Sequence, residues 1–118
     1  MKRRLRLRRR ADFQAAVKGK RVYSGRAFVA FAVPSEAPGS RVGITVSRSI
    51  KGSVDRNRAR RRLREVSRTH LFGDSAVTRR GIPLDVVLIA RPAALEISYA
   101  DLKAEATQVA LKLSSLNS

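Results

Sequence analysis

Residues 84–90 form the segment that most restricts how this chain can fold. The sequence LDVVLIA is apolar at all positions except Asp85, and a short, continuous apolar run is typical of a strand buried on both faces. Such a strand fits the interior of a sheet better than its edge. We therefore expect a central strand here, with neighbouring strands on both sides and other elements covering both faces of the sheet.

Two earlier segments predict the neighbouring strands. Residues 21–33 have extended character that is interrupted at Ser24 and Gly25, and apolar side chains occupy both faces of the second half. Residues 34–40, PSEAPGS, are typical of a turn-rich loop. Residues 42–46 then alternate apolar side chains with small or polar ones, which predicts a third strand with one small, polar face.

Three segments have helical patterns. Residues 11–18 carry apolar side chains at helical spacing, and Gly19 follows where a C-terminal cap belongs. A second helix is expected over residues 56–69 with Asp55 as its cap. Ser98, followed three residues later by Asp101, is a capping box that opens a final helix. The apolar stripe of this helix consists of Leu102, Ala106, Val109, Ala110 and Leu113.

The order of these elements predicts the fold class. Helix, strand, strand, strand, helix, strand and helix make an α+β protein, αβββαβα, with a mixed central sheet packed by helices. A helix between two strands makes at least one parallel pair probable on topological grounds. With 118 residues, the chain has the length of one domain, which we assign to residues 1–118. Residues 1–10 are strongly basic and are expected to form an arm, disordered or bound to RNA.

The charge of the chain indicates a polyanionic partner. The sequence has 26 Lys and Arg residues against nine Asp and Glu, a formal charge of +17. Residues 1–20 and 48–68 contain 18 of the 26 basic residues. Cysteine is absent, and there is neither a signal segment nor an apolar stretch that spans a bilayer, so we expect a cytoplasmic protein. Binding to a membrane surface is not expected, because the most basic helix lacks a wide apolar face with Trp or Phe.

The predicted helix over residues 56–69 is the main candidate for binding RNA. Seven arginines lie within thirteen positions, 56–68, and their repulsion at spacings of three and four residues opposes helix formation. On a helical wheel, Ala59, Leu63, Val66 and His70 share a narrow stripe that docks on the sheet, and most arginines face outward. Guanidinium groups suit phosphates and bases because their planar fork binds two oxygens and stacks on rings.

Residues beside this helix extend the candidate interface. Arg48 and Lys51 place cations between the third strand and the helix, together with the hydroxyl groups of Ser47 and Ser49. Asn57 has two open roles, as a backbone cap or as a contact to a base edge or a ribose hydroxyl. Phe13 and Phe31 are the aromatic side chains flanked by cations, so they are candidates for stacking on unpaired bases.

A catalytic or metal site of the protein itself is not expected. Protein phosphodiesterases need clustered carboxylates for two metal ions, or a pair of histidines for acid and base. The nine acidic residues are scattered along the chain, and His70 is the single histidine. We interpret His70 as a partly buried core residue. These residues therefore do not favour a stand-alone nuclease.

The motifs resemble a known family over nearly the whole chain. The run SRSIKGSVDRNRARRRLRE, residues 47–65, resembles the signature of the protein subunit of bacterial ribonuclease P, an RNR box continued by arginines. The resemblance includes ADFQAAVKGKR, AFVAF, RVGITVS and LDVVLIARPAALEISYADLKAE in the same order. It implies an αβββαβα fold with an unusual left-handed βαβ crossover around the RNR helix. The alternative, a ribosomal or other general RNA-binding protein, shares the composition but lacks this order of motifs.

The resemblance also implies a mechanism and a set of partners. Ribonuclease P removes the 5′ leader of precursor tRNA by hydrolysing one phosphodiester bond, and its RNA subunit carries out catalysis with magnesium held by the RNA and the substrate. The protein is expected to be a non-catalytic subunit of this endoribonuclease, with one copy per RNA. The residues expected to bind RNA are Arg48, Lys51, Arg56, Asn57, Arg58, Arg60, Arg61, Arg64 and Arg68. The expected leader-binding cleft contains Phe13, Val17 and Phe31, where relatives have phenylalanine at the position of Val17 and tyrosine at that of Phe31.

Overall fold

The structure is a computed structural model that describes residues 10–35, 41–70 and 84–116. Its elements are, in chain order, α1 (Arg10–Val17), β1 (Lys20–Ser24), β2 (Phe28–Pro34), β3 (Arg41–Val46), α2 (Ser53–His70), β4 (Leu84–Ala90), the 3-10 helix η2 (Pro92–Leu95) and α4 (Tyr99–Leu116). This order confirms the predicted αβββαβα arrangement, to which η2 is the addition. Residues 1–9 of the predicted arm, most of the 34–40 loop and the loop before β4 lie outside the described residues. Arg10, the last residue of the predicted arm, is the first residue of α1.

The strands form one mixed sheet in the order β1-β2-β4-β3. The β1–β2 and β2–β4 pairs are antiparallel, and the β3–β4 pair is parallel. The expected central strand, residues 84–90, is therefore an interior strand, and α2 makes the connection that its parallel pair requires. In this register Val86 lies between Ala32 and Val42 on one face, and Val87 lies between Phe31 and Gly43 on the other.

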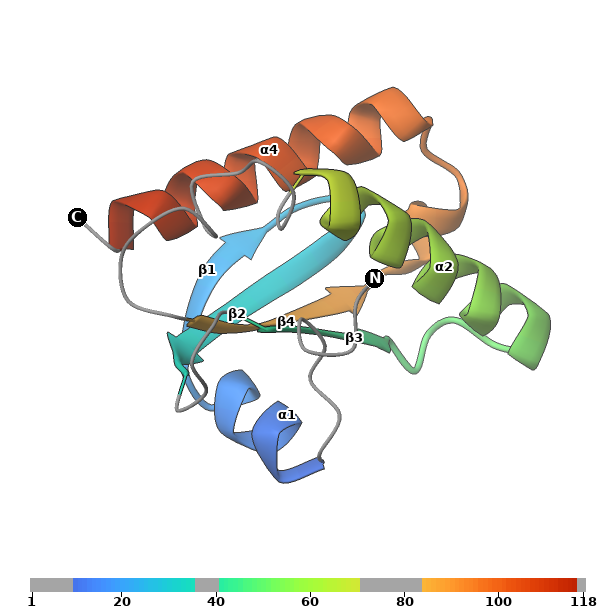
Figure 1. Cartoon of the computed structure of the whole chain (residues 1–118). Helices are drawn as coiled ribbons and strands as arrows, with labels where there is room; N and C mark the ends of the chain where they lie inside the picture. Colours follow the sequence, from blue (N-terminus) through green and yellow to red (C-terminus); the bar gives the residue numbers. More distant parts are fainter. Residues whose placement is uncertain (1–9, 36–40, 71–83, 117–118) are drawn as a thin grey trace.

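Helices cover the two faces of the sheet unequally (Figure 1). Helices α2 and α4 pack side by side on one face, where Leu63, Leu88 and Leu102 are fully buried in the main core. Helix α1 lies alone on the opposite face, and its Ala16 is buried against Val87. Because α1 has only eight residues, part of this second face stays half-exposed. Its half-exposed strand residues are Val29, Phe31, Val33, Thr45 and Ile89.

The polar residue of the central strand has a specific partner. Asp85 is buried, and Arg41 of β3 donates two hydrogen bonds to its carboxylate, at 2.9 and 2.7 Å. A bidentate pair of this kind satisfies both carboxylate oxygens at once. The pair joins β3 to β4 where the two strands begin, in register.

The ends of the helices confirm one predicted cap and correct two others. At the start of α4, the Asp101 N–H donates to Ser98 Oγ at 3.1 Å, as the capping box predicts. The prediction that Asp55 caps α2 was wrong, because α2 begins at Ser53 and Asp55 lies in its first turn. There the carboxylate still stabilises the positive end of the helix dipole. Gly52, with a φ of 83°, precedes the helix and supplies the left-handed conformation that lets α2 begin earlier.

Gly19 has a role different from the expected cap. Its N–H donates to Ala16 O at 2.9 Å. A Cβ atom at this position would lie 2.7 Å from Ala32 O and 3.1 Å from Val33 Cβ. The glycine is needed because the end of α1 passes close to the backbone of β2, and this close approach sets where α1 sits on the sheet.

Candidate nucleic-acid interface

Helix α2 docks on the sheet through the stripe that its sequence predicts. Ala59, Leu63 and Val66 are fully buried, whereas the side chain of His70 lies outside the described residues. The seven arginines of α2 lie outside this stripe. The structure divides six of them into two sets with different neighbours, and the seventh, Arg68, pairs with Glu65.

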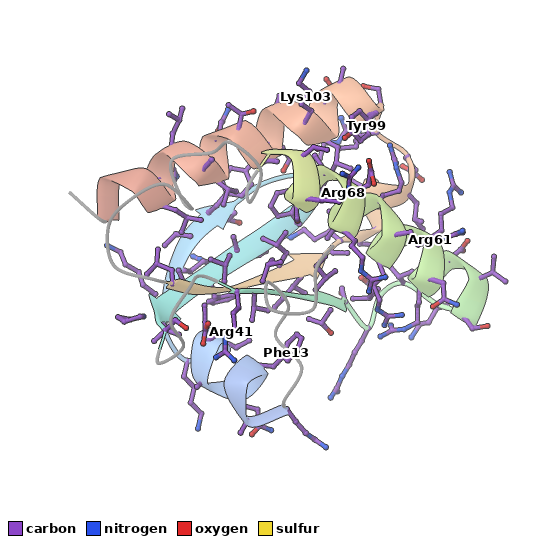
Figure 2. The ribbon with its side chains drawn as sticks, viewed as in Figure 1. Phe13, Arg41, Arg61, Arg68, Tyr99 and Lys103 are labelled. Atoms are coloured by element: carbon purple, nitrogen blue, oxygen red, sulfur yellow. The ribbon has the colours of Figure 1, made fainter. Side chains whose placement is uncertain are left out.

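The outward set consists of Arg60, Arg61 and Arg64. Together with Val54 and Asn57, these residues line a groove of about 420 Å³ on the exposed side of α2. Among the described residues, this lining has three guanidinium groups and no carboxylate, a composition that suits an anion. Among the labelled residues in Figure 2, Arg61 and Arg68 lie along α2, on the side of the sheet opposite to Phe13.

Asn57 belongs to this groove and does not cap the helix. Because α2 begins at Ser53, Asn57 lies beyond the first turn, so the capping role considered for it was wrong. Its side-chain oxygen accepts a hydrogen bond from Arg60 Nη1 at 3.0 Å. The amide therefore orients one guanidinium of the outward set, and Asn57 itself is exposed.

The inward set consists of Arg56, Arg58 and Arg62, whose guanidinium groups bind backbone carbonyls. Arg62 donates to Ala94 O at 2.6 Å and to Ile97 O at 2.7 Å, and Arg58 donates to Leu95 O at 3.1 Å. These bonds fasten α2 to η2 and to the turn that leads into α4. Arg58 was a predicted RNA contact and Arg62 was not. For neither residue did the sequence indicate a bond to backbone more than thirty residues away.

Arg68 has an acidic partner. Its Nη2 donates to Glu65 Oε1 at 2.6 Å, one turn earlier on α2. This hydrogen bond raises the pKa of the Arg68 guanidinium, which stays fully charged. Both side chains are about half exposed, and such pairs contribute little stability. The carboxylate nevertheless offsets part of the charge that Arg68 offers to an anion.

The turn between β3 and α2 carries two further exposed cations at the entry to α2. Arg48, Ser49 and Lys51 are exposed in this turn, whereas Ile50 is buried. The hydroxyl groups of Ser47 and Ser49 lie 2.8 Å apart. Arg48 and Lys51 thus lie where the sequence predicts, at the entry to α2.

A second groove lies between α1 and the edge strand β3. It has a volume of about 730 Å³ and is lined by Arg10, Phe13, Gln14, Val17, Lys18, Ile44 and Thr45. Phe13 lies between α1 and the sheet in Figure 2, and Val17 is 39% exposed. An aromatic ring on an apolar floor with cations at the rim suits an unpaired strand of nucleic acid, whose bases stack while its phosphates meet the cations.

The structure brings together two of the three residues predicted for the leader cleft. Phe13 and Val17 line the groove, whereas Phe31 does not. Phe31 is half-buried on the same face of the sheet, in register with Arg21 and Val87. The sequence reasoning missed the contribution of Ile44 and Thr45. The small, polar face of residues 42–46 was a signal for Thr45, whereas Ile44 is in register with Leu88 of the main core and belongs to the other face.

The described parts of the chain hold no cluster of three or more His, Cys, Asp or Glu side chains that suits a metal ion. Over the same residues, no helix is long and apolar enough to cross a membrane. The chemistry of the two grooves is that of binding by guanidinium groups, amides and an aromatic ring.

Comparison with known proteins assigns the chain to a family. The family profile described as Ribonuclease P matches residues 1–114. The chain belongs to the ribonuclease P protein family. The ribonuclease P protein component of Acidothermus cellulolyticus is 39% identical over 104 residues, covering 86% of this chain and 82% of that protein. The component of Streptococcus thermophilus is 32% identical over 116 residues, covering 98% and 97%.

Solved ribonuclease P proteins share the fold. The Staphylococcus aureus protein superposes with a TM-score of 0.71 at 27% identity, covering 97% of this chain and 98% of its own. The Thermotoga maritima protein superposes with a TM-score of 0.66 at 25% identity, covering 85% and 89%. Membership of the family makes the chain an RNA-binding protein subunit of ribonuclease P, an endoribonuclease of tRNA processing with an RNA partner. A ribosomal protein is the less favoured reading.

Proposed function

We propose that the chain binds the catalytic RNA of ribonuclease P through α2 and the turn before it, and binds the 5′ leader of precursor tRNA through the groove between α1 and β3. The RNA subunit then hydrolyses the phosphodiester bond that joins the leader to the tRNA. The observation that carries the proposal is that two grooves of different chemistry lie close together in the sequence. Ile44 and Thr45 line the first groove, and Val54 lines the second.

The outward groove suits a structured, phosphate-rich partner. Guanidinium groups can bind phosphate oxygens in pairs, and the turn before α2 adds two exposed cations. The proposed contacts to the catalytic RNA are Arg48, Lys51, Asn57, Arg60, Arg61 and Arg64. Arg68 is a weaker contact at the far end of the same helix because Glu65 shares its charge.

The groove between α1 and β3 suits a single strand. Phe13 offers a ring for one base, Val17 and Ile44 offer apolar contacts, and Arg10 and Lys18 face the phosphates. Thr45 lines this groove, and the turn with Arg48 begins two residues later. A leader lying in the groove would therefore reach the cations at the start of α2, next to the catalytic RNA.

Magnesium belongs to the RNA and substrate in this proposal. The described residues that line the two grooves are unsuited to a divalent cation, because they offer guanidinium, ammonium and amide groups and no carboxylate. The protein's contribution is to bind and orient, and to neutralise phosphates as the RNA folds around the cleavage site. We place the complex in the cytoplasm, with one protein per RNA.

Reconstitution tests the proposal. The purified chain is added to the ribonuclease P RNA from the same genome, and leader removal from precursor tRNA is followed over a range of magnesium concentrations. We expect the protein to lower the magnesium concentration needed for half-maximal cleavage and to strengthen binding of precursor more than of mature tRNA. An unchanged magnesium requirement would contradict the proposal. Cleavage by the protein without RNA would instead indicate a stand-alone nuclease.

A further inference from the structure

Arg56 has an unusual environment for a residue of an RNA-binding helix. Its Nη1 donates to Ser47 O at 3.0 Å and to Ile50 O at 3.1 Å, and its Nη2 donates to Val46 O at 3.2 Å. One guanidinium thus binds three carbonyls from the end of β3 and the turn that follows. The side chain is half-buried, and both N–H groups of Nη1 are engaged, so a phosphate could bind Nη1 only by displacing a carbonyl.

The turn held by Arg56 is fixed at several other points. The Ser47 N–H donates to Ala90 O at 2.9 Å and extends the pairing of β3 with β4. The Ile50 N–H donates to Ser47 O at 3.1 Å, the Ser49 N–H donates to Ser47 Oγ at 3.2 Å, and the Ile50 side chain is 3% exposed. The backbone of the turn therefore faces the protein, and Arg48 and Lys51 are left to face the solvent.

The three carbonyls of this turn need a donor that reaches all of them together. Arginine has a rigid planar fork with five N–H donors, whereas lysine offers a single ammonium on a flexible stem. A lysine at position 56 would keep the charge but could not hold the same three acceptors in one geometry. The turn would then sample more conformations, and its two exposed cations would lose their fixed positions.

We infer that Arg56 is a positioning residue, which holds the turn over residues 47–52 so that Arg48 and Lys51 present a preorganised pair of cations to RNA phosphates. The inference rests on the proposed function, because it assumes that the turn meets RNA. It assigns to Arg56 an indirect role in place of the direct RNA contact that the family resemblance implied. Binding to a preordered turn avoids the entropy cost of ordering it in the complex.

The test compares Arg56→Lys with the matched control Arg61→Lys in two backgrounds, the natural sequence and the double variant Arg48→Ala/Lys51→Ala. Dissociation constants for ribonuclease P RNA are measured over a salt series, and amide hydrogen exchange over residues 47–52 is measured in the free protein. Arg56→Gln is studied in parallel, and thermal unfolding of each variant shows whether the fold is kept.

We expect Arg56→Lys to accelerate exchange in the turn about tenfold and to weaken RNA binding about fivefold in the natural background. In the double variant, where the turn has no cations left to position, the same substitution should change binding by less than twofold. Arg61→Lys should leave exchange in the turn unchanged and have the same effect on binding in both backgrounds.

Three results would overturn the inference. Equal losses from Arg56→Lys in both backgrounds would make Arg56 a direct contact. Full RNA binding by Arg56→Lys, with weak binding by Arg56→Gln, would mean that charge alone matters. Faster exchange without loss of binding would separate the order of the turn from RNA recognition. In each of these cases the natural protein still supports leader removal, so the failure is distinct from a failure of the proposed function.

Discussion

The arginines on the two sides of α2 make different contacts. Arg62 binds the carbonyls of Ala94 and Ile97, which fastens the helix to the segment that leads into α4. Arg61, the preceding residue, is exposed and lines the outward groove. The density of arginines in the sequence therefore exceeds the number that can face RNA, because part of the set donates hydrogen bonds to backbone carbonyls that would otherwise lack a donor.

The positions of Arg56, Arg61 and Arg62 around the helix account for part of the division. At about 100° per residue, Arg56 and Arg62 lie roughly 60° to either side of Ala59, whereas Arg61 lies on nearly the opposite side of the helix. A long side chain beside the docking stripe can turn its head toward backbone at the edge of the interface, while its stem covers apolar surface. On the far side, Arg61 is exposed and lines the outward groove.

Removing the outward set should have the largest effect on RNA binding. The triple variant Arg60→Ala, Arg61→Ala and Arg64→Ala should weaken binding of ribonuclease P RNA by about three orders of magnitude, at about 1.5 kcal/mol for each charge-assisted contact. The slope of log affinity against log salt should fall by about 1 per lost phosphate contact. Titrations at several salt concentrations measure both quantities, and an unchanged slope would remove this set from the interface.

Removing Arg62 should instead affect stability. Arg62→Ala leaves the carbonyls of Ala94 and Ile97 without their donor, and we expect a loss of about 2–3 kcal/mol in the free energy of unfolding. The control Arg61→Ala should change it by less than about 0.5 kcal/mol. Urea denaturation measures the difference between the two variants. Equal stabilities would show that the inward bonds do not hold the fold.

Phe13→Ala separates the α1 groove from the arginine groove. Loss of one stacking ring should weaken binding of leader-bearing precursor tRNA by ~1–3 kcal/mol, with little change for mature tRNA. Dissociation constants of the reconstituted complex for the two tRNAs measure this difference. If both tRNAs lose affinity equally, Phe13 serves the core beneath α1 and does not contact the leader.

Ser67→Ala should have the smallest effect of these substitutions, and it should stabilise the protein, whereas Arg62→Ala destabilises it. Ser67 is fully buried on the inward side of α2, and within the described residues its hydroxyl has no hydrogen-bond partner. Replacing a buried, unpaired hydroxyl by a methyl group should raise the free energy of unfolding by up to about 1 kcal/mol. RNA binding should not change. A loss of stability would indicate that the hydroxyl is satisfied in solution.

Sequence patterns predicted those parts of the fold that depend on local periodicity. The central strand over residues 84–90, the stripe of α4 and the Ser98 cap all follow from the spacing of side chains along one segment. The predicted start of α2, at Arg56 after an Asp55 cap, was three residues too late. The preceding turn ends at Gly52, whose φ is left-handed, and the helix begins at Ser53.

The hydrogen-bond partners of Arg58 and Arg62 could not be predicted from the sequence for a different reason. The acceptors of Arg58 and Arg62 lie in a 3-10 helix that begins after β4, and only the folded chain brings them to α2. Likewise, the volume beside Phe13 depends on how closely Gly19 lets α1 approach β2. The sequence therefore indicated that arginines and an aromatic residue form the two grooves, but it did not indicate which arginines line them.

The adjacent residues Arg61 and Arg62 provide the most direct test that α2 has one face for RNA and one for the fold. Affinity of Arg61→Gln and Arg62→Gln for ribonuclease P RNA would be measured across a salt series, at a temperature where both variants are folded. We predict that the salt slope falls by about 1 for Arg61→Gln and stays at the natural value for Arg62→Gln. An equal fall for both variants would contradict the division of α2 into two faces.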